Sequence, residues 1–131
     1  MPTHGTFDPE QVLIAQGRIG FIDFDSFCLA EPALDVGLFL AAIMDAGLKA
    51  GSDSLVSRNA RMARLDELAG IGEVFLAEYE RLAPISRPRV ALWQALDFLL
   101  DALHTWTKVK LSGPDNDMLI LEHHLRSMGL W

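Results

Sequence analysis

The chain has 131 residues, half of them apolar, and a formal net charge of −7. This length corresponds to a single domain, which we place at residues 1–131. The negative charge argues against a nucleic-acid-binding protein, because such proteins neutralise phosphates with clustered lysine and arginine. A cationic small molecule would be a better-matched partner. The alternative is that the negative charge serves only to keep the protein surface hydrated.

The sequence predicts a soluble, cytoplasmic protein. No apolar run approaches the ~18 residues needed to cross a bilayer, and no basic segment with an apolar core follows Met1. Cys28 is the one cysteine, so an internal disulfide is excluded and a reducing compartment is favoured. We expect Cys28 to act as a small apolar filler.

The first predicted element is a β-hairpin. Residues 12–15 and 19–22 are short apolar segments rich in β-formers, and the three residues between them include Gly17, which can adopt a positive φ. The second strand would carry Asp23 and Asp25 at its end.

Helical periodicity fills most of the remaining chain. The predicted helices cover approximately residues 32–47, 55–82, 88–110 and 115–128. Pro32 and Pro88 suit first helical turns, Asp115 suits an N-cap, and Gly70 with Gly72 predicts a break in the second helix. The predicted fold class is α+β and mostly helical, with the hairpin in residues 1–31 and four to five helices in residues 32–131.

Three motifs lie at fixed spacing near the start of the chain. His4-Gly5-Thr6-Phe7-Asp8-Pro9-Glu10-Gln11 is followed by Ile22-Asp23-Phe24-Asp25 and then by Pro32-Ala33-Leu34-Asp35. Their order resembles the catalytic loop, metal-binding turn and following helix of the aminoglycoside phosphotransferase and choline kinase-like family. The resemblance implies a protein kinase-like C-terminal lobe and, for the lineage, ATP-dependent phosphoryl transfer to the hydroxyl of a small molecule.

The resemblance also implies roles for individual residues. The family's loop reads His-Gly-Asp with an Asn five positions later, so Thr6 stands at the catalytic Asp and Gln11 at the Asn. Phosphoryl transfer uses a carboxylate to accept the hydroxyl proton, and a Thr hydroxyl is no base near neutral pH. Asp8 is the nearby carboxylate that could substitute. By the same resemblance the cofactors are ATP and Mg²⁺, with ligands Gln11, Asp23 and Asp25 and loop-bracing residues His4 and Asp35.

The family's N-terminal, ATP-clamping lobe has no counterpart in the sequence. There is no Gly-x-Gly-x-x-Gly segment, and Lys49, Lys108 and Lys110 all lie downstream, in helical regions of the chain. We therefore expect a fragment of a longer protein or a shortened gene product, without significant kinase activity as this chain alone. The alternatives are a pseudokinase-like binding or dimerisation module, and a helical domain whose loop matches by chance.

An absent lobe would leave apolar surface uncovered. Val12, Ile14, Phe21 and Phe27 are the candidates for exposure, and the hairpin offers an unpaired edge. The expected partner is therefore a second copy of the chain, in a homodimer, or the missing lobe.

The third predicted helix is apolar nearly all round. Its polar residues share one face: Gln94, Asp97, Asp101, His104 and Lys108. This face is an ordinary solvent stripe, or, as the family resemblance implies, Asp97 and Asp101 line a pocket for a cationic acceptor such as an aminosugar or choline.

Other side chains receive structural interpretations. Arg58, Arg61 and Arg64 predict a charged solvent-facing stripe. The adjacent His123 and His124 lack the spacing of a zinc site. The tryptophans are expected to pack in the core and at the terminus: Trp93, Trp106 and Trp131.

Overall fold

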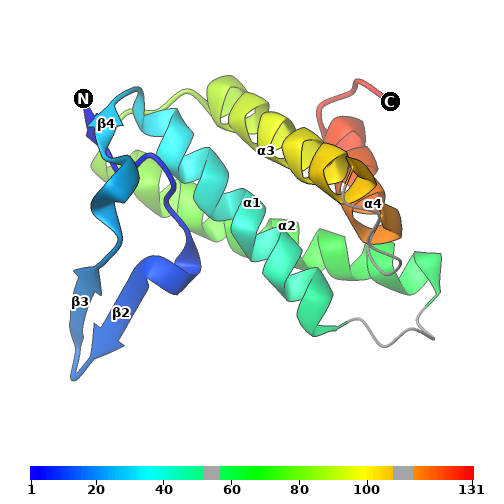
Figure 1. The fold of residues 1–131 in the computed structure, drawn as a ribbon, viewed down its shortest axis with the longest axis horizontal. Coiled ribbons are helices and arrows are strands. Elements are labelled where there is room, and N and C mark those ends of the chain that lie inside the picture. Colours follow the sequence, from blue (N-terminus) through cyan, green and yellow to red (C-terminus); the bar gives the residue numbers. More distant parts are fainter. Residues whose placement is uncertain (52–56, 108–113) are drawn as a thin grey trace.

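The computed structural model describes residues 1–51, 57–107 and 114–131. Within these ranges, four helices make up most of the structure and short strands form two small sheets (Figure 1). In chain order the elements are β1 (Pro2–Thr3), the 3₁₀ turn η1 (Pro9–Gln11), β2 (Val12–Ala15), β3 (Arg18–Phe21), the 3₁₀ turn η2 (Phe24–Ser26), β4 (Cys28–Leu29), α1 (Pro32–Ala50), α2 (Arg58–Leu82), α3 (Arg87–Thr107) and α4 (Pro114–Ser127). The predicted class, α+β and mostly helical, is confirmed.

The predicted hairpin is present and projects away from the helices (Figure 1). β2 and β3 pair antiparallel from Val12 opposite Phe21 to Ala15 opposite Arg18. Its loop is therefore the two residues Gln16 and Gly17, whose φ angles of 51° and 75° are both positive. Two positive φ angles are typical of the tight turn that matches the twist of paired strands.

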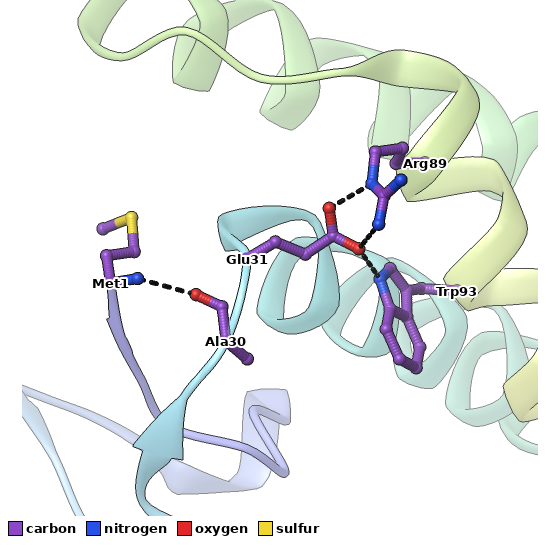
Figure 2. Close-up of polar contacts among 5 residues, drawn as sticks. All are labelled: Met1, Ala30, Glu31, Arg89 and Trp93. Atoms are coloured by element: carbon purple, nitrogen blue, oxygen red, sulfur yellow. Dashed lines mark hydrogen bonds and ion pairs between the residues drawn. The ribbon is translucent and has the colours of Figure 1, made fainter.

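A second, two-stranded sheet fastens the start of the chain. β1 pairs antiparallel with β4, and the amino group of Met1 donates a hydrogen bond to the carbonyl of Ala30 at 2.9 Å (Figure 2). No pattern in the sequence indicated this sheet, because each strand has two residues and its partner is distant along the chain. Cys28 lies in β4 and is exposed, so its interpretation as an apolar filler is wrong.

Helix α1 lies at the centre of the helical part. Its buried residues contribute to both apolar clusters of the core, one formed with α2, α3 and α4 and the other with α2 and α3. The fully buried side chains of largest volume are Leu48, Leu65, Val90 and Ile120. Each of the four helices thus supplies one of them.

Two glycines in α1 allow neighbouring helices to approach closely. A Cβ at Gly37 would lie 2.6 Å from the Cβ of Trp93 in α3, and one at Gly47 would lie 2.3 Å from a methyl group of Leu68 in α2. Gly47 is therefore a packing residue, and α1 continues beyond it to Ala50. The prediction that the helix ends near Gly47 is wrong.

The predicted break in the second helix is also wrong. α2 is continuous through Gly70 and Gly72. Leu65 and Leu68 before these glycines, and Leu76 after them, are buried against the core. Their burial offsets the cost of about 1 kcal/mol for each helical glycine.

Polar contacts join α1 to α3 near the chain's start. The carboxylate of Glu31, just before α1, accepts hydrogen bonds from the guanidinium of Arg89 and from the indole N–H of Trp93 (Figure 2). Arg89 and Trp93 together lower the pKa of Glu31. Trp93 is thus anchored between helices, whereas Trp106 and Trp131 are largely exposed and contradict the prediction that they pack.

Two of the three arginines that were predicted to form a solvent-facing stripe on α2 also contact α4. Arg58 makes a two-pronged ion pair with Glu122 of α4, and Arg61 donates a hydrogen bond to Asn116 at 2.8 Å. α4 begins at Pro114, which places Asp115 inside the first turn and not at the N-cap. The predicted end of the third helix, residues 108–110, lies outside the described residues.

Candidate functional site

The carboxylate of Asp35 holds the loop that precedes the hairpin. One of its oxygens accepts a hydrogen bond from the backbone N–H of His4 at 2.6 Å, and the other accepts from Gly5 at 2.8 Å. Hydrogen bonds to an ionised acceptor are shorter and stronger than neutral ones. Because Asp35 lies in the first turn of α1, the loop is fixed to the most central helix.

His4 joins the same loop to the end of β3. Its ring is buried, and Nε2 donates to the carbonyl of Ile22 at 2.9 Å. The backbone N–H of Ile22 in turn donates to the carbonyl of Gln11 at 3.1 Å. Ile22 is therefore tied to both ends of the loop, and Asp23 follows it directly.

The chain reverses sharply after β3. Asp23 has φ 65° and ψ 57°, a left-handed conformation, and precedes η2. Gly5 in the facing loop also has a positive φ of 89°, and a Cβ placed there would lie 2.1 Å from the carbonyl oxygen of Ser26. The loop and the turn after Asp23 are thus in backbone contact, which only glycine permits at position 5.

An aromatic cluster also fixes the loop. Phe7 stacks on Phe39 of α1 with ring centroids 4.8 Å apart, and Phe39 contacts Phe75 of α2 at 4.7 Å. Phe7 also meets Phe21 of β3 edge-on at 5.7 Å. The sequence analysis did not predict this role of Phe7. An apolar side chain between the polar Thr6 and Asp8 could have indicated that the loop packs against the helices.

Gln11 and Asp23 lie at the same end of the hairpin, since Gln11 precedes β2 and Asp23 follows β3. The side-chain oxygen of Gln11 is buried without a hydrogen-bond partner. Such an unsatisfied oxygen is costly unless something binds it. Asp23 makes no capping hydrogen bond with η2, and Asp25 is exposed within that turn.

These oxygens fit a hard cation such as Mg²⁺, which is bound by a few carboxylate or amide oxygens together with phosphate groups and waters. In the part of the chain that the structure describes, no three His, Cys, Asp or Glu side chains gather as a metal site. Gln11 and Asp23 are the residues at this end of the hairpin that could contribute oxygen ligands to such an ion.

A cavity of about 420 Å³ opens beside the loop, between it and helices α1 and α3. Its lining residues are Gly5, Thr6, Phe7, Asp8, Leu34, Leu38, Ala42, Trp93, Leu96, Asp97 and Leu100. Most of this surface is apolar, and its two carboxylates are Asp8 and Asp97. Asp101 is not among these lining residues.

Thr6 and Asp8, the two residues predicted to stand at a catalytic position, both line this cavity. Thr6 is exposed at the cavity. One carboxylate oxygen of Asp8 accepts a hydrogen bond from the backbone N–H of Glu10 at 2.6 Å and so caps η1. This contact assigns Asp8 a structural role in the loop.

The electrostatic environment of the cavity favours positive charge. Burial, followed by the nearby carboxylates Asp101, Asp45 and Asp8, raises the pKa of Asp97 to about 6. Burial, Asp45 and Asp117 also raise the pKa of Asp101. A cation bound beside Asp97 would offset both the desolvation of its carboxylate and the repulsion from the neighbouring carboxylates.

Replacing Asp97 with asparagine should stabilise the protein in a pH-dependent manner. With a raised pKa, the native state holds a proton that the unfolded state releases between about pH 4 and 6, so the wild type loses stability as pH rises through that range. Asp97→Asn should therefore be more stable than wild type at pH 8, by about 1 kcal/mol after allowance for solvent screening, and nearly equal at pH 4.

Urea denaturation at pH 4, 5, 6 and 8 measures this difference. Glu67→Gln, at an exposed carboxylate paired with Arg64 on α2, is the matched control and should show no such trend. A stability difference for Asp97→Asn that is constant over the whole range would contradict the assignment.

Comparison of the chain with protein-family models, with curated proteins and with solved structures found no match in any of the three. Across residues 1–51, 57–107 and 114–131, no helix combines the length and apolar character required to cross a bilayer. The function is therefore inferred from the geometry of the site.

Proposed function

We propose that this chain is the metal- and phosphate-binding part of an ATP-dependent small-molecule phosphotransferase, with a protein kinase-like C-lobe similar to that of the aminoglycoside phosphotransferase and choline kinase-like family. The observation that carries the proposal is the double hydrogen bond from the His4 and Gly5 amides to Asp35. It joins the loop motif that begins at His4 to the helix motif that contains Asp35. Ile22, in the motif that contains Asp23, is hydrogen-bonded to both ends of the same loop.

The proposed site uses Gln11 and Asp23 to hold Mg²⁺ against nucleotide phosphates. The buried, unpartnered oxygen of Gln11 supports this role. When bound, the metal would neutralise phosphate charge. Asp35 and His4 keep the loop in place. Thr6 faces the side on which the acceptor would bind, but its hydroxyl is no base for the acceptor's proton.

The chain is proposed to bind nucleotide without transferring phosphate at a significant rate. Thr6 lacks the carboxylate, and Asp8 already accepts the Glu10 amide. Loss of general-base catalysis alone costs about 10²–10⁴-fold in rate. The acceptor in the lineage would be a small organic cation, because the adjoining cavity combines apolar walls with Asp8 and Asp97.

Isothermal titration with ATP and either Mg²⁺ or Mn²⁺ tests the proposal. We expect weak, metal-dependent binding of ATP. Its affinity should fall at least ~10-fold in Asp23→Ala and in Gln11→Ala, because each variant loses a proposed metal ligand. Glu78→Gln, which removes one negative charge from an exposed pair on α2, is the matched control and should bind as wild type does.

The same samples distinguish the proposal from its alternative. Release of phosphate should stay at the level of a protein-free blank. Absence of nucleotide binding with either metal would contradict the proposal and favour a module without nucleotide chemistry.

That alternative is a pseudokinase-like binding or dimerisation module, and exposed apolar surface on the hairpin favours it. Ile14, Phe21 and Phe27 are exposed, as expected, while Val12 is half-buried. Ile19 adds to the patch. In this reading the protein pairs through the hairpin, as a homodimer or with an N-terminal lobe of the kind that the family carries.

A further inference from the structure

Helix α3 carries an apolar stripe on its solvent side. The exposed fractions of the five side chains lie between 41% and 76%, and the residues are Leu92, Leu96, Leu99, Leu103 and Trp106. The helix already buries another face, through Val90 and Phe98, in the protein's own core. The stripe is therefore a second apolar face, and no described element covers it.

The spacing of the stripe is that of a helix–helix interface. Successive members are four, three, four and three residues apart, the alternation that places side chains along the seam of a coiled coil. The positions beside the seam are also uncharged: Ala95, Ala102, Leu100 and Thr107. A helix could pack along α3 without burying an unpaired charge.

We propose that α3 is a homodimer interface, in which the α3 helices of two copies pack antiparallel about a two-fold axis near residues 97–98. In this register Leu96 packs against Leu99 of the second copy, and Leu92 against Leu103. This inference does not depend on the proposed nucleotide site, although Leu96 of the stripe also lines the cavity beside the loop.

Arg89 determines the antiparallel orientation. It lies three residues before Leu92 on the same stripe, is exposed, and is held in place by Glu31 (Figure 2). In the antiparallel register Arg89 lies beside Trp106 of the second copy, an arrangement that favours a cation–π contact. A parallel pair would instead place the two Arg89 side chains opposite each other, where like charges repel.

The size of the stripe indicates a reversible dimer. A helix of 21 residues is about 30 Å long, and two helices packed along that length bury an area at the low end of stable interfaces. The net charge of −7 on each copy adds long-range repulsion. Added salt should therefore strengthen the dimer by screening that repulsion.

Sedimentation velocity of the whole chain, from about 1 to 200 μM, tests the interface. The wild type should dimerise reversibly, and Leu99→Glu should weaken dimerisation at least ~10-fold because it places a charge in the seam. Ile14→Glu, the same kind of change on the exposed hairpin, is the matched control and should dimerise as the wild type does. Circular dichroism checks that both variants keep their helices.

Two results would overturn the interface. The wild type could remain monomeric throughout this range, or Ile14→Glu could abolish the dimer while Leu99→Glu leaves it intact. The second result would place pairing on the hairpin.

Disulfide trapping tests the orientation. With Cys28→Ser as background, Leu96→Cys and Leu99→Cys proteins should cross-link when they are mixed and oxidised, and neither should cross-link alone. Cross-linking of either variant by itself, or no cross-link in the mixture, would overturn the antiparallel register.

Discussion

Replacing Asp35 with alanine should lower the free energy of unfolding by about 3–6 kcal/mol, because a hydrogen bond to a charged group contributes about 1.5–3 kcal/mol and this carboxylate accepts two. The variant also leaves the His4 and Gly5 amides without their acceptor. Urea denaturation measures the loss. Hydrogen exchange should show the His4 and Gly5 amides losing protection before the core helices do.

Two companion variants make the Asp35 result specific. Asp35→Asn keeps one carbonyl oxygen and should lose about half as much stability. Asp45→Ala, on the same helix, removes a carboxylate whose partner is the exposed Lys49 four residues away, and should change stability by less than about 1 kcal/mol. Unchanged protection of the His4 and Gly5 amides in Asp35→Ala would show that the loop does not depend on this carboxylate.

The sequence predicted those elements whose signals are local. Gly17 between two apolar segments identified the hairpin, and Pro32 marked the start of α1. The contact between His4 and Asp35 spans 31 residues, so no periodicity could have indicated it. Only the family resemblance pointed to that pair.

The incorrect predictions share one physical cause, which is packing between segments distant in sequence. Gly47 was interpreted as a helix end because glycine is a poor helix former, but Leu68 of α2 occupies the space that a side chain would need. Gly70 and Gly72 remain helical because the leucines around them are buried. Local propensity could not indicate either neighbour.

Exposure was equally hard to predict from residue type. Trp106 and Cys28 are commonly buried residues, yet both lie at the surface here. Trp106 belongs to the stripe on α3, where an apolar side chain is consistent with a surface that a second copy covers. The sequence showed that this helix is apolar nearly all round, but only the structure distinguished its buried face from its exposed one.

Replacing Gly5 with alanine should be as disruptive as removing Asp35. Two costs combine: a positive φ costs a residue with a Cβ about 1–2 kcal/mol, and forcing atoms into occupied space costs about 1–3 kcal/mol more. The added Cβ would lie 2.1 Å from the Ser26 carbonyl oxygen, a backbone atom that cannot rotate aside. We expect a loss of about 2–5 kcal/mol in unfolding free energy, measured by urea denaturation.

Gly17→Ala separates the two costs. Gly17 has a φ of 75°, close to the 89° of Gly5, but no atom lies within 4 Å of the position where its Cβ would be. It should therefore lose only the conformational part, about 1–2 kcal/mol. The excess in Gly5→Ala would measure the contact between the loop and the turn after Asp23, and weaker nucleotide binding should accompany it if that contact positions the metal ligands. Equal losses in the two variants would mean that the loop and the turn are not in contact, and the proposed site would lose its geometric basis.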